Sequence, residues 1–302
     1  MDLQKKLYLI IDAGGTYFKS AIADAEAEIL PGSTFQTRSW SEGPAVKIMN
    51  AYRETISFGL DCIRGERANL SGIGIATPGP FDYKMGMPLM KHKFSAIYGL
   101  KLPELIYKMP GMQPEIPICF MHDANAALAG EIWKGNARGF DNTALVTLGT
   151  GLGFAFSENG EVRYNTQGGP ARSIFTLPYG NGVLEDYVSK RGILKMYQLK
   201  SGKLGDDIKV SDIGKWANGG DIKCIEIFKE VGSILAKALY EILDQKGIQC
   251  LLFGGQISRS FHHMEESLKA GLEKIKSLQK ISEVKNIEHA ALLGVLWKIM
   301  NI

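Results

Sequence analysis

The chain has 302 residues, of which 45% are hydrophobic and 22% are charged, and its formal net charge is +3. Counted at roughly 150 residues per domain, this length predicts two domains. The composition argues against a disordered chain, and so small a net charge argues against a nucleic-acid or membrane partner.

The first part of the sequence alternates strand and helix patterns. Leu7–Ile11 is an apolar run typical of a buried strand, and Phe18–Ala23 resumes as a strand after the turn at 12–16, which predicts a hairpin. The further elements expected here are a strand at 29–36, a helix at 44–63, a strand at 72–76, a loop at 81–99, a strand at 117–121 and a helix at 124–133.

The second part repeats this order. Thr143–Leu148 is a predicted strand that returns as Gly153–Ser157 after a glycine turn, much like the first hairpin. The elements expected after it are helices at 182–190, 211–218 and 221–246, a strand at 249–253, and helices at 258–277 and 288–300. Alternating strands and helices favour an α/β class, and the repeated opening hairpin indicates two related domains. We assign residues 1–116, completed by the helix within 288–302, to the first domain and 117–287 to the second.

Cysteines and apolar segments predict a cytoplasmic location. The four cysteines show no CxxC spacing, and we interpret them as buried thiols in a reducing compartment. Residues 1–6 lack the apolar core of a signal peptide. No apolar run reaches the length of about 18 residues that a membrane-spanning helix needs.

Glycine is unusually frequent, with 35 residues, and it gathers in short turns. Three turns share this enrichment: Gly14-Gly15, Gly149-Thr150-Gly151-Leu152-Gly153 and Gly254-Gly255. A hairpin needs only one or two glycines, whereas additional ones let backbone N–H groups approach an anion, to which a threonine hydroxyl adds a donor. Tight turns without a ligand are the alternative, but two such turns opening two similar domains favour phosphate binding. Behind the third turn we expect a helix whose N-terminus is capped by Ser258. Such an N-terminus would suit the phosphate or sugar side of a nucleotide.

Two acids are candidates for chemistry. Asp123 follows a predicted strand and starts a predicted helix, so it is either the N-cap of that helix or a carboxylate facing a cleft between the domains. In the second case it accepts a proton from a substrate hydroxyl during phosphoryl transfer. Asp12, at the first turn, is a candidate for holding Mg²⁺ through water.

Four ordered motifs carry a resemblance to a known family. They are Asp12-Ala13-Gly14-Gly15-Thr16, Asp123-Ala124-Asn125-Ala126-Ala127, Leu148-Gly149-Thr150-Gly151-Leu152-Gly153 and Phe253-Gly254-Gly255. Their order and spacing over nearly the whole chain resemble the ROK family of bacterial sugar kinases. The resemblance implies two RNase-H-like domains of the actin-like ATPase fold, a cleft between them, and ATP-dependent phosphorylation of a sugar hydroxyl in a homodimer.

The resemblance also implies roles for individual residues. It implies that Asp123 is the catalytic base and that Asp12 lies near Mg²⁺. It implies contacts with ATP at Asp12, Gly14, Gly15, Thr16, Gly149, Thr150, Gly151, Gly153, Gly254 and Gly255. It implies contacts with the sugar at Gly79, His122, Asn125 and Glu185.

This sequence departs from the family on the sugar side. The family has Asn where this chain has His122, and it has a Gly-x-Glu-x-Gly-His stretch and a cysteine-rich zinc loop where residues 165–189 contain neither Cys nor His. Thiolate and imidazole are the ligands of structural zinc, so we expect no zinc site. His122 and Arg172 are candidates for reading the sugar. Lys91–Lys93 are further candidates, although their pattern favours a solvated loop.

Three other functions are considered. A ROK-type repressor carries an N-terminal helix-turn-helix, which we do not expect here because the first hairpin already begins at Leu7. A sugar-binding regulator or pseudokinase would keep the fold without turning over a hexose, and a kinase could act on an amino sugar or a polyol. No role is assigned to His262-His263.

Overall fold

The computed structural model describes residues 5–66, 68–202 and 208–302. Residues 1–4, part of the segment in which we expected no signal peptide, lie outside the described residues. The chain divides into two compact units. The first consists of Met1–Lys134, Tyr164–Pro170 and Glu288–Ile302, and the second of Gly135–Arg163 and Ala171–Ile287.

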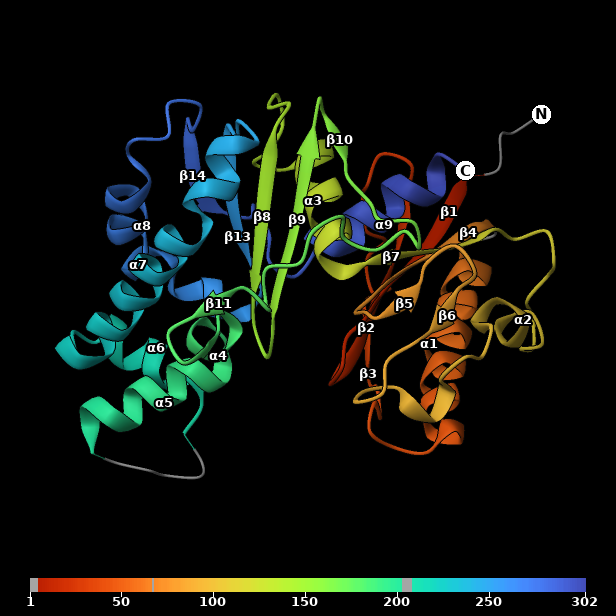
Figure 1. The fold of residues 1–302 in the computed structure, drawn as a ribbon. Helices are drawn as coiled ribbons and strands as arrows, with labels where there is room; N and C mark the ends of the chain where they lie inside the picture. The colour runs from red at the N-terminus through yellow and green to blue at the C-terminus, as the bar shows by residue number, and fades with distance from the viewer. Residues whose placement is uncertain (1–4, 67, 203–207) are drawn as a thin grey trace. The chain divides into compact units, whose positions relative to one another are not determined.

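The first unit is built on a five-stranded sheet in the order β3-β2-β1-β4-β7 (Figure 1). Its strands are β1 (Lys6–Ala13), β2 (Tyr17–Asp24), β3 (Phe35–Arg38), β4 (Asn69–Thr77) and β7 (Ile118–His122). The first three strands are antiparallel, while β4 and β7 run parallel to β1. The hairpin predicted at the start of the chain is therefore confirmed.

Helices cover both faces of this first sheet. The main ones are α1 (Ala45–Gly65), α3 (Asp123–Lys134) and α9 (Ala290–Met300). Leu9 on β1 contacts Gly59 of α1. Its partner on β4 is Ile73, and the next residue, Gly74, lies against Val295 of α9. Since successive strand residues point to opposite faces, α1 and α9 pack on opposite sides. Smaller elements complete the unit: β5 (Phe81–Asp82), β6 (Met87–Pro88), η1 (Ser95–Ile97) and α2 (Leu102–Ile106).

Helices α3 and α9 cross in backbone contact. A Cβ placed on Gly294 would overlap the carbonyl oxygen of Ala126, and one placed on Gly130 would overlap that of Ala290. Gly130 and Gly294, 164 positions apart in sequence, thus allow the two helices to meet closely, which joins the C-terminal helix to the first unit.

The second unit repeats the sheet order of the first, β10-β9-β8-β13-β14. Its strands are β8 (Thr143–Leu148), β9 (Leu152–Glu158), β10 (Glu161–Val162), β13 (Cys250–Gly254) and β14 (Lys280–Glu283). Antiparallel pairing joins β8 to β9 and β9 to β10, and β13 and β14 are parallel to β8. The same topology in both units confirms the repeat expected from the two glycine hairpins.

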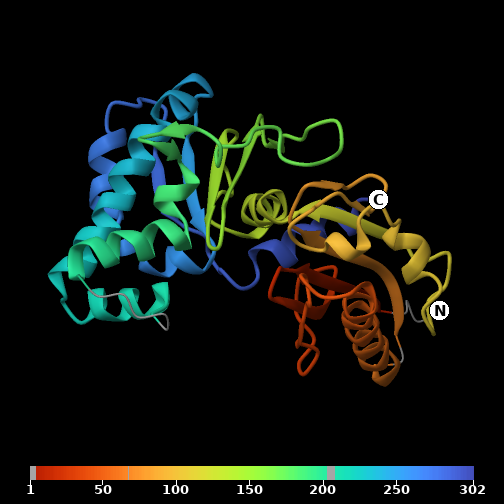
Figure 2. The same cartoon turned by 60° about the horizontal axis from the view of Figure 1, so that its bottom comes forward.

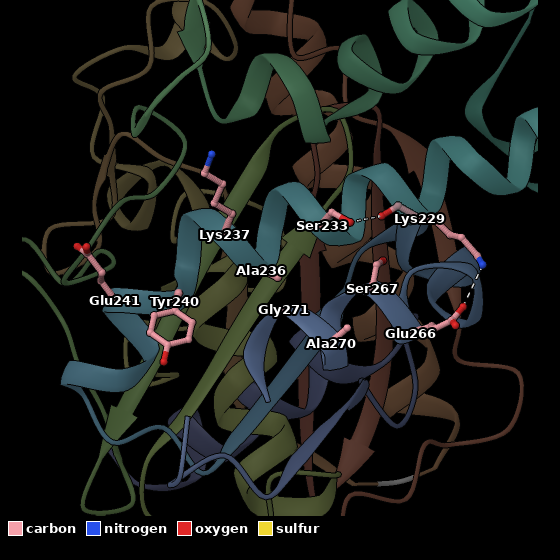
Figure 3. A pocket seen from close by; sticks show the side chains of 10 residues that line it. All are labelled: Lys229, Ser233, Ala236, Lys237, Tyr240, Glu241, Glu266, Ser267, Ala270 and Gly271. Atoms are coloured by element: carbon pink, nitrogen blue, oxygen red, sulfur yellow. Dashed lines mark hydrogen bonds and ion pairs between the residues drawn. The ribbon is translucent and has the colours of Figure 1, made fainter. Parts of the chain in front are cut away.

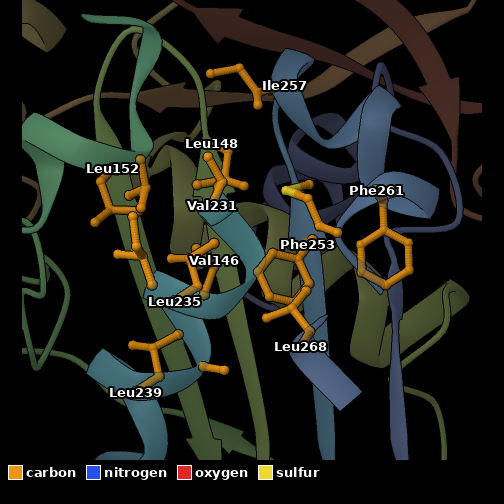
Figure 4. Packing of buried hydrophobic residues seen from close by; sticks show 14 of the residues in the cluster. Val146, Leu148, Leu152, Val231, Leu235, Leu239, Phe253, Ile257, Phe261 and Leu268 are labelled. Carbon is orange, nitrogen blue, oxygen red and sulfur yellow. The ribbon is translucent and has the colours of Figure 1, made fainter. Parts of the chain in front are cut away.

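The helices of the second unit lie mainly on one side of its sheet (Figure 2). They are α4 (Glu185–Val188), α5 (Lys190–Ser201), α6 (Val210–Asn218), α7 (Ile222–Gln245), η2 (Gln256–His263) and α8 (Glu265–Leu272), with a small hairpin of β11 (Pro178–Tyr179) and β12 (Gly182–Val183). Val231, Leu235 and Leu239, one helical turn apart, pack from α7 onto the core that contains Val146 and Phe253 (Figure 4). This spacing is the reason that α7 was predictable from sequence.

Several expected elements differ from the structure. The strand expected at 29–36 is shorter and later, at Phe35–Arg38, and the loop expected at 81–99 contains β5, β6 and η1. Helix α5 and strand β14 were not expected. The helix expected at 182–190 shrinks to Glu185–Val188. The helix expected at 258–277 divides into η2 and α8, with non-helical backbone at Ser260.

Two further expectations need correction. Ser258 is not an N-cap, because it lies inside η2, which begins after Gly255, and its hydroxyl donates to the Gly255 carbonyl at 2.7 Å. The domain boundary expected at residue 116 also differs. Because β7 pairs with β4 and α3 packs on α9, the chain stays in the first unit until Lys134.

Within the described residues, no helix is both long and apolar enough to cross a bilayer. All four cysteines are free thiols, and Cys62 is the least buried of them.

Candidate functional site

The carboxyl ends of three parallel strands meet at one edge of the first sheet. Asp12 on β1 is in register with Ala76 on β4, and Thr77 on β4 is in register with His122 on β7. Asp123 follows directly as the first residue of α3. Ligands of α/β sheets bind outside such strand ends. The first unit therefore brings both predicted acids to one edge.

Asp123 presents an accessible carboxylate at this edge. Its side chain is 42% exposed, and its Oδ1 accepts the adjacent Ala124 N–H at 2.7 Å and lies 3.0 Å from Nδ1 of His122. An N-cap side chain instead accepts from the second or third helical N–H. The geometry of Asp123 thus differs from ordinary capping and leaves its second oxygen available to a substrate hydroxyl.

Asp12 lies in a strongly acidic environment. Burial and the negative charges of Asp123 and Glu288 raise the pKa of Asp12 to about 7, against the opposing effect of Lys19. Lys19 faces Asp12 across the β1–β2 hairpin and is itself paired with Glu288. A carboxylate whose ionised form is destabilised by burial and by nearby negative charge makes a site where a hard cation with oxygen ligands is favoured.

The first glycine turn is held by hydroxyl groups. Ser39 and Ser41 both donate to the carbonyl oxygen of Gly15, and the Ser39 N–H donates to the carbonyl of Thr16 at 3.0 Å. A Cβ on Gly14 would lie 3.0 Å from the carbonyl oxygen of Tyr17, which is tighter than ordinary contacts. Close approach of backbone therefore favours glycine at position 14, and Thr16 is exposed.

Tyr83 joins the sugar-side candidates of the first unit, although no sequence signal pointed to it. Its hydroxyl donates to the Thr77 carbonyl at 3.2 Å, its ring meets His122 edge-on at 5.9 Å, and a Cβ on Gly79 would lie 3.1 Å from its hydroxyl. Burial and the charge of Asp123 raise the pKa of Tyr83 above its ordinary value, so the phenol stays protonated.

Residues 164–170 fold back onto Tyr83. Asn165 Oδ1 accepts the N–H groups of Gln167 and Gly169, both at 2.9 Å, and the Tyr83 N–H donates to the Gln167 carbonyl at 2.9 Å. Gly168 has φ +82°, and a Cβ there would lie 3.1 Å from Cβ of Tyr83. This segment, which replaces the family's Gly-x-Glu-x-Gly-His stretch, is thus an Asn-closed turn packed on the Tyr83–His122 pair.

Asn125 differs from the other predicted sugar contacts because its side chain is fully buried within α3. Arg172, Lys91 and His92 are exposed. Sugar contact by these residues stays a prediction.

The second glycine turn, between β8 and β9, is bound to α4 and α5. Glu185 Oε2 accepts the Leu152 N–H at 2.8 Å, and the Lys190 N–H donates to the Gly149 carbonyl at 2.9 Å. A Cβ on Gly151 would lie 2.9 Å from Glu185 Oε2. Glu185 also pairs with Arg191 at 3.0 Å. In this structure Glu185 therefore supports the second turn, and its predicted contact with sugar stays a prediction.

The third glycine turn lies at the same end of the second sheet. Gly254 is in register with Thr147 across parallel strands. Gly255 has φ +82°, and a Cβ there would overlap the carbonyl oxygen of Leu148. The turn therefore requires glycine, and it lies beside the strand that leads into Gly149. Gly153 lies within β9, opposite Thr147.

Two other features lie away from these turns. His262 and His263 both place Nε2 within hydrogen-bonding distance of Asn218 Oδ1, at 3.0 and 2.8 Å. A groove between α7 and α8 (Figure 3) is lined by Lys229, Ser233, Ala236, Lys237, Tyr240, Glu241, Glu266, Ser267, Ala270 and Gly271. None of the predicted site residues lines it. Over the described ranges, no three His, Cys, Asp or Glu side chains are grouped to hold a metal ion.

Comparison with known proteins identifies relatives over almost the full chain. The ROK family profile matches residues 8–297. Glucokinase from Halalkalibacterium halodurans is 24% identical over 292 residues, which cover 90% of this chain and 86% of the relative. Glucokinase from Thermotoga maritima is 28% identical over 276 residues, which cover 84% of each.

Solved structures agree on the fold. A ROK family glucokinase from Streptomyces griseus, in complex with glucose and AMPPNP, aligns with a TM-score of 0.80 at 21% identity, covering 98% of this chain and all of that one. A ROK family transcriptional regulator, a homologue of the E. coli MLC protein, aligns with a TM-score of 0.84 at 18% identity, covering 98% of this chain and 78% of that one. The fold is the actin-like ATPase fold with two RNase-H-like units. Because the family profile matches nearly the whole sequence, this chain belongs to the ROK family.

Proposed function

We propose that this protein transfers the terminal phosphoryl group of ATP to a sugar hydroxyl. The observation that carries the proposal is the meeting of Asp123, Asp12 and the first glycine turn at one edge of the first sheet. The names of the glucokinase relatives support the same reaction. Each unit is proposed to contact ATP through its own glycine turn.

Asp123 is proposed as the base. Its exposed carboxylate accepts the proton of the sugar hydroxyl while that oxygen bonds to phosphorus and the bond to the departing ADP oxygen breaks. Carboxylates in general are weak bases for a free sugar hydroxyl. The proton is therefore expected to move late, when the attacking oxygen has become acidic.

Asp12 is proposed to hold Mg²⁺ through water. The raised pKa of about 7, caused by burial and by Asp123, indicates that a cation is favoured beside this carboxylate. Mg²⁺ keeps several waters, so one protein carboxylate together with phosphate oxygens suits it. When bound, the ion neutralises charge on the phosphates.

The sugar is proposed to be a hexose or an amino sugar that meets the surface around His122, Tyr83 and Gly79. These residues lie together beside Asp123 in the first unit, and the turn at 164–170 packs against them. Since this surface replaces the family's usual sugar residues, its preference is expected to differ from that of a glucokinase.

A sugar-binding regulator without turnover is the second candidate. One observation favours it: residues 165–172 lack the family's sugar ligands. The Xylose repressor of Bacillus subtilis is also a relative, at 27% identity over 210 residues, which cover 67% of this chain and 52% of the repressor.

The test is ATP consumption with Mg²⁺ across a panel of hexoses, amino sugars and polyols, together with AMPPNP binding. Turnover of one sugar that falls by at least about 100-fold in Asp123→Ala, with AMPPNP binding kept, supports the proposal. AMPPNP binding without turnover of any sugar supports the regulator instead. Turnover that is equal in Asp123→Ala removes Asp123 from its role.

The proposal also covers location and assembly. We propose a cytoplasmic protein, because its four cysteines are free thiols. We propose a homodimer from the family resemblance. Sedimentation of the purified chain measures its oligomeric state and tests this proposal.

A further inference from the structure

Lys93 lies directly over the first glycine turn. A Cβ placed on Gly15 would lie 3.2 Å from both Cδ and Nζ of Lys93, and 3.3 Å from its Cε. The space that a side chain at position 15 would fill is therefore taken by the outer half of a lysine from residue 93. The sequence alone favoured a solvated loop for all of Lys91–Lys93. This contact distinguishes Lys93 from its two neighbours, because it places the Lys93 side chain on the glycine turn.

The backbone next to Lys93 is fastened to the same turn. Phe94, in the left-handed region with φ 52°, is 2% exposed and packs its ring 6.1 Å from that of Phe18 on β2. Its N–H donates to the carbonyl of Ser41, whose hydroxyl donates to the Gly15 carbonyl. A buried anchor and two hydrogen bonds thus hold Lys93 beside Gly15.

The charge of Lys93 is not neutralised by a neighbouring carboxylate. Among the residues that the structure describes, no Asp or Glu forms an ion pair with Lys93, whereas Lys19, the cation that acts on Asp12, pairs with Glu288. Lys91 and His92 are both exposed, while Lys93 is half-buried. A half-buried ammonium on a glycine turn, without a counter-ion, is suited to an anionic ligand.

We propose that Lys93 is a phosphate-binding residue of the first glycine turn, and that its ammonium contacts the terminal phosphates of a nucleoside triphosphate. The proposal rests on the proposed function. Glycine-rich phosphate sites combine backbone N–H donors with a lysine that acts as a point charge. Here the lysine comes from a segment 78 positions beyond the turn, and a side chain at position 15 would crowd its end atoms.

The decisive measurement is the affinity for Mg²⁺–AMPPNP by titration calorimetry at low salt, compared with the affinity for adenosine, which has no phosphate. Lys93→Met keeps most of the apolar length and removes the charge. We expect it to weaken AMPPNP binding by about 10- to 100-fold and to leave adenosine binding unchanged. Lys93→Arg, which keeps the cation, is expected to recover most of the loss.

Lys91→Met is the matched control, since it removes the same charge two positions away from an exposed side chain. It is expected to bind AMPPNP within about twofold of the wild type, because exposed charges are screened. Thermal unfolding of each variant verifies that it is folded.

Three results would overturn the role of Lys93. One is AMPPNP binding by Lys93→Met that equals the wild type. The second is an equal loss for adenosine and AMPPNP, which would mean that Lys93 only supports the turn. The third is an equal loss in Lys91→Met. Failure of the wild type to bind AMPPNP at all would instead overturn the proposed function and Lys93 with it.

Discussion

Nδ1 of His122 lies 3.0 Å from Oδ1 of Asp123, and both atoms receive the N–H of Ala124, at 3.2 and 2.7 Å. The shared Ala124 N–H thus holds one oxygen of the proposed base beside the imidazole at the start of α3. Tyr83 meets the same ring edge-on and limits its rotation. His122 is therefore placed to orient Asp123, a role that the sequence did not suggest beyond its departure from the family's Asn.

Removing His122 is expected to slow turnover more than it weakens sugar binding. We expect His122→Ala to lower kcat by about 10-fold, because Asp123 loses the ring that lies beside its Oδ1 and shares the Ala124 N–H with it. We expect His122→Asn to keep more activity, because its amide oxygen can accept the same N–H. Steady-state kinetics on the sugar found in the panel measure both variants. A raised KM with unchanged kcat would make His122 a sugar ligand and not a positioning residue.

Changes at Glu185 separate support of the second turn from contact with sugar. Glu185→Ala removes the acceptor of the Leu152 N–H, and we expect AMPPNP affinity to fall by about 5- to 10-fold as the turn loosens. Glu185→Gln keeps an oxygen acceptor and is expected to bind AMPPNP as well as the wild type or better, because a negative charge near phosphate is removed. Titration calorimetry with AMPPNP measures the affinity of both variants. If both variants change only the KM for sugar, the role implied by the family resemblance is correct.

Asp12 predicts a pH dependence of stability in the absence of Mg²⁺. Its pKa is raised from 3.8 to about 7 in the folded protein by burial and by Asp123. The folded state therefore holds a proton that the unfolded state releases, so this contribution is complete below about pH 4 and is lost as the pH rises to about 7. The loss is at most about 4 kcal/mol, since each unit of pKa is worth 1.36 kcal/mol.

Urea midpoints at pH 5 and pH 8 check this expectation in the wild type and in Asp12→Asn. We expect the midpoint to fall between the two pH values by more in the wild type than in the variant. Added Mg²⁺ at pH 8 should raise only the wild-type midpoint. Parallel pH profiles for the two proteins would show that Asp12 titrates normally.

The crossing of α3 and α9 predicts a large loss of stability in Gly294→Ala. The added methyl overlaps the Ala126 carbonyl, so the helices must separate, and we expect a loss of about 3 kcal/mol in the free energy of unfolding. Gly65→Ala, at the end of α1 where a Cβ meets no atom within 4 Å, is the control. It is expected to be neutral or stabilising by up to about 1 kcal/mol. Equal midpoints for the two variants would contradict the close crossing.

The metal content of the protein tests the expectation that residues 165–189 bind no zinc. This segment has neither thiol nor imidazole, so we expect elemental analysis of the purified protein to find no stoichiometric zinc, and chelator treatment to leave its thermal unfolding unchanged. One zinc ion per chain would show that ligands elsewhere replace the family's cysteines.

The parts that sequence predicts well are those governed by local pattern. The hairpins at Leu7–Ala23 and Thr143–Ser157 were predictable because apolar runs flank a glycine turn, and α7 because its apolar residues recur every turn. Helix α5 was missed because only Gly192, Ile193 and Met196 of its twelve residues are buried, while Leu199 is 76% exposed, so the pattern is weak.

By itself, the sequence determined the repeated α/β architecture, the family and the positions of the glycine turns, because glycine spacing and strand patterns are local properties of the chain. Only the tertiary structure decided that β7 and α3 belong to the first unit, that Glu185 lies on the second turn, and that Lys93 rather than Lys91 covers Gly15. These relationships depend on strand pairing and on a buried phenylalanine that anchors its segment. Contacts between residues so far apart in the chain leave no periodic signal in it.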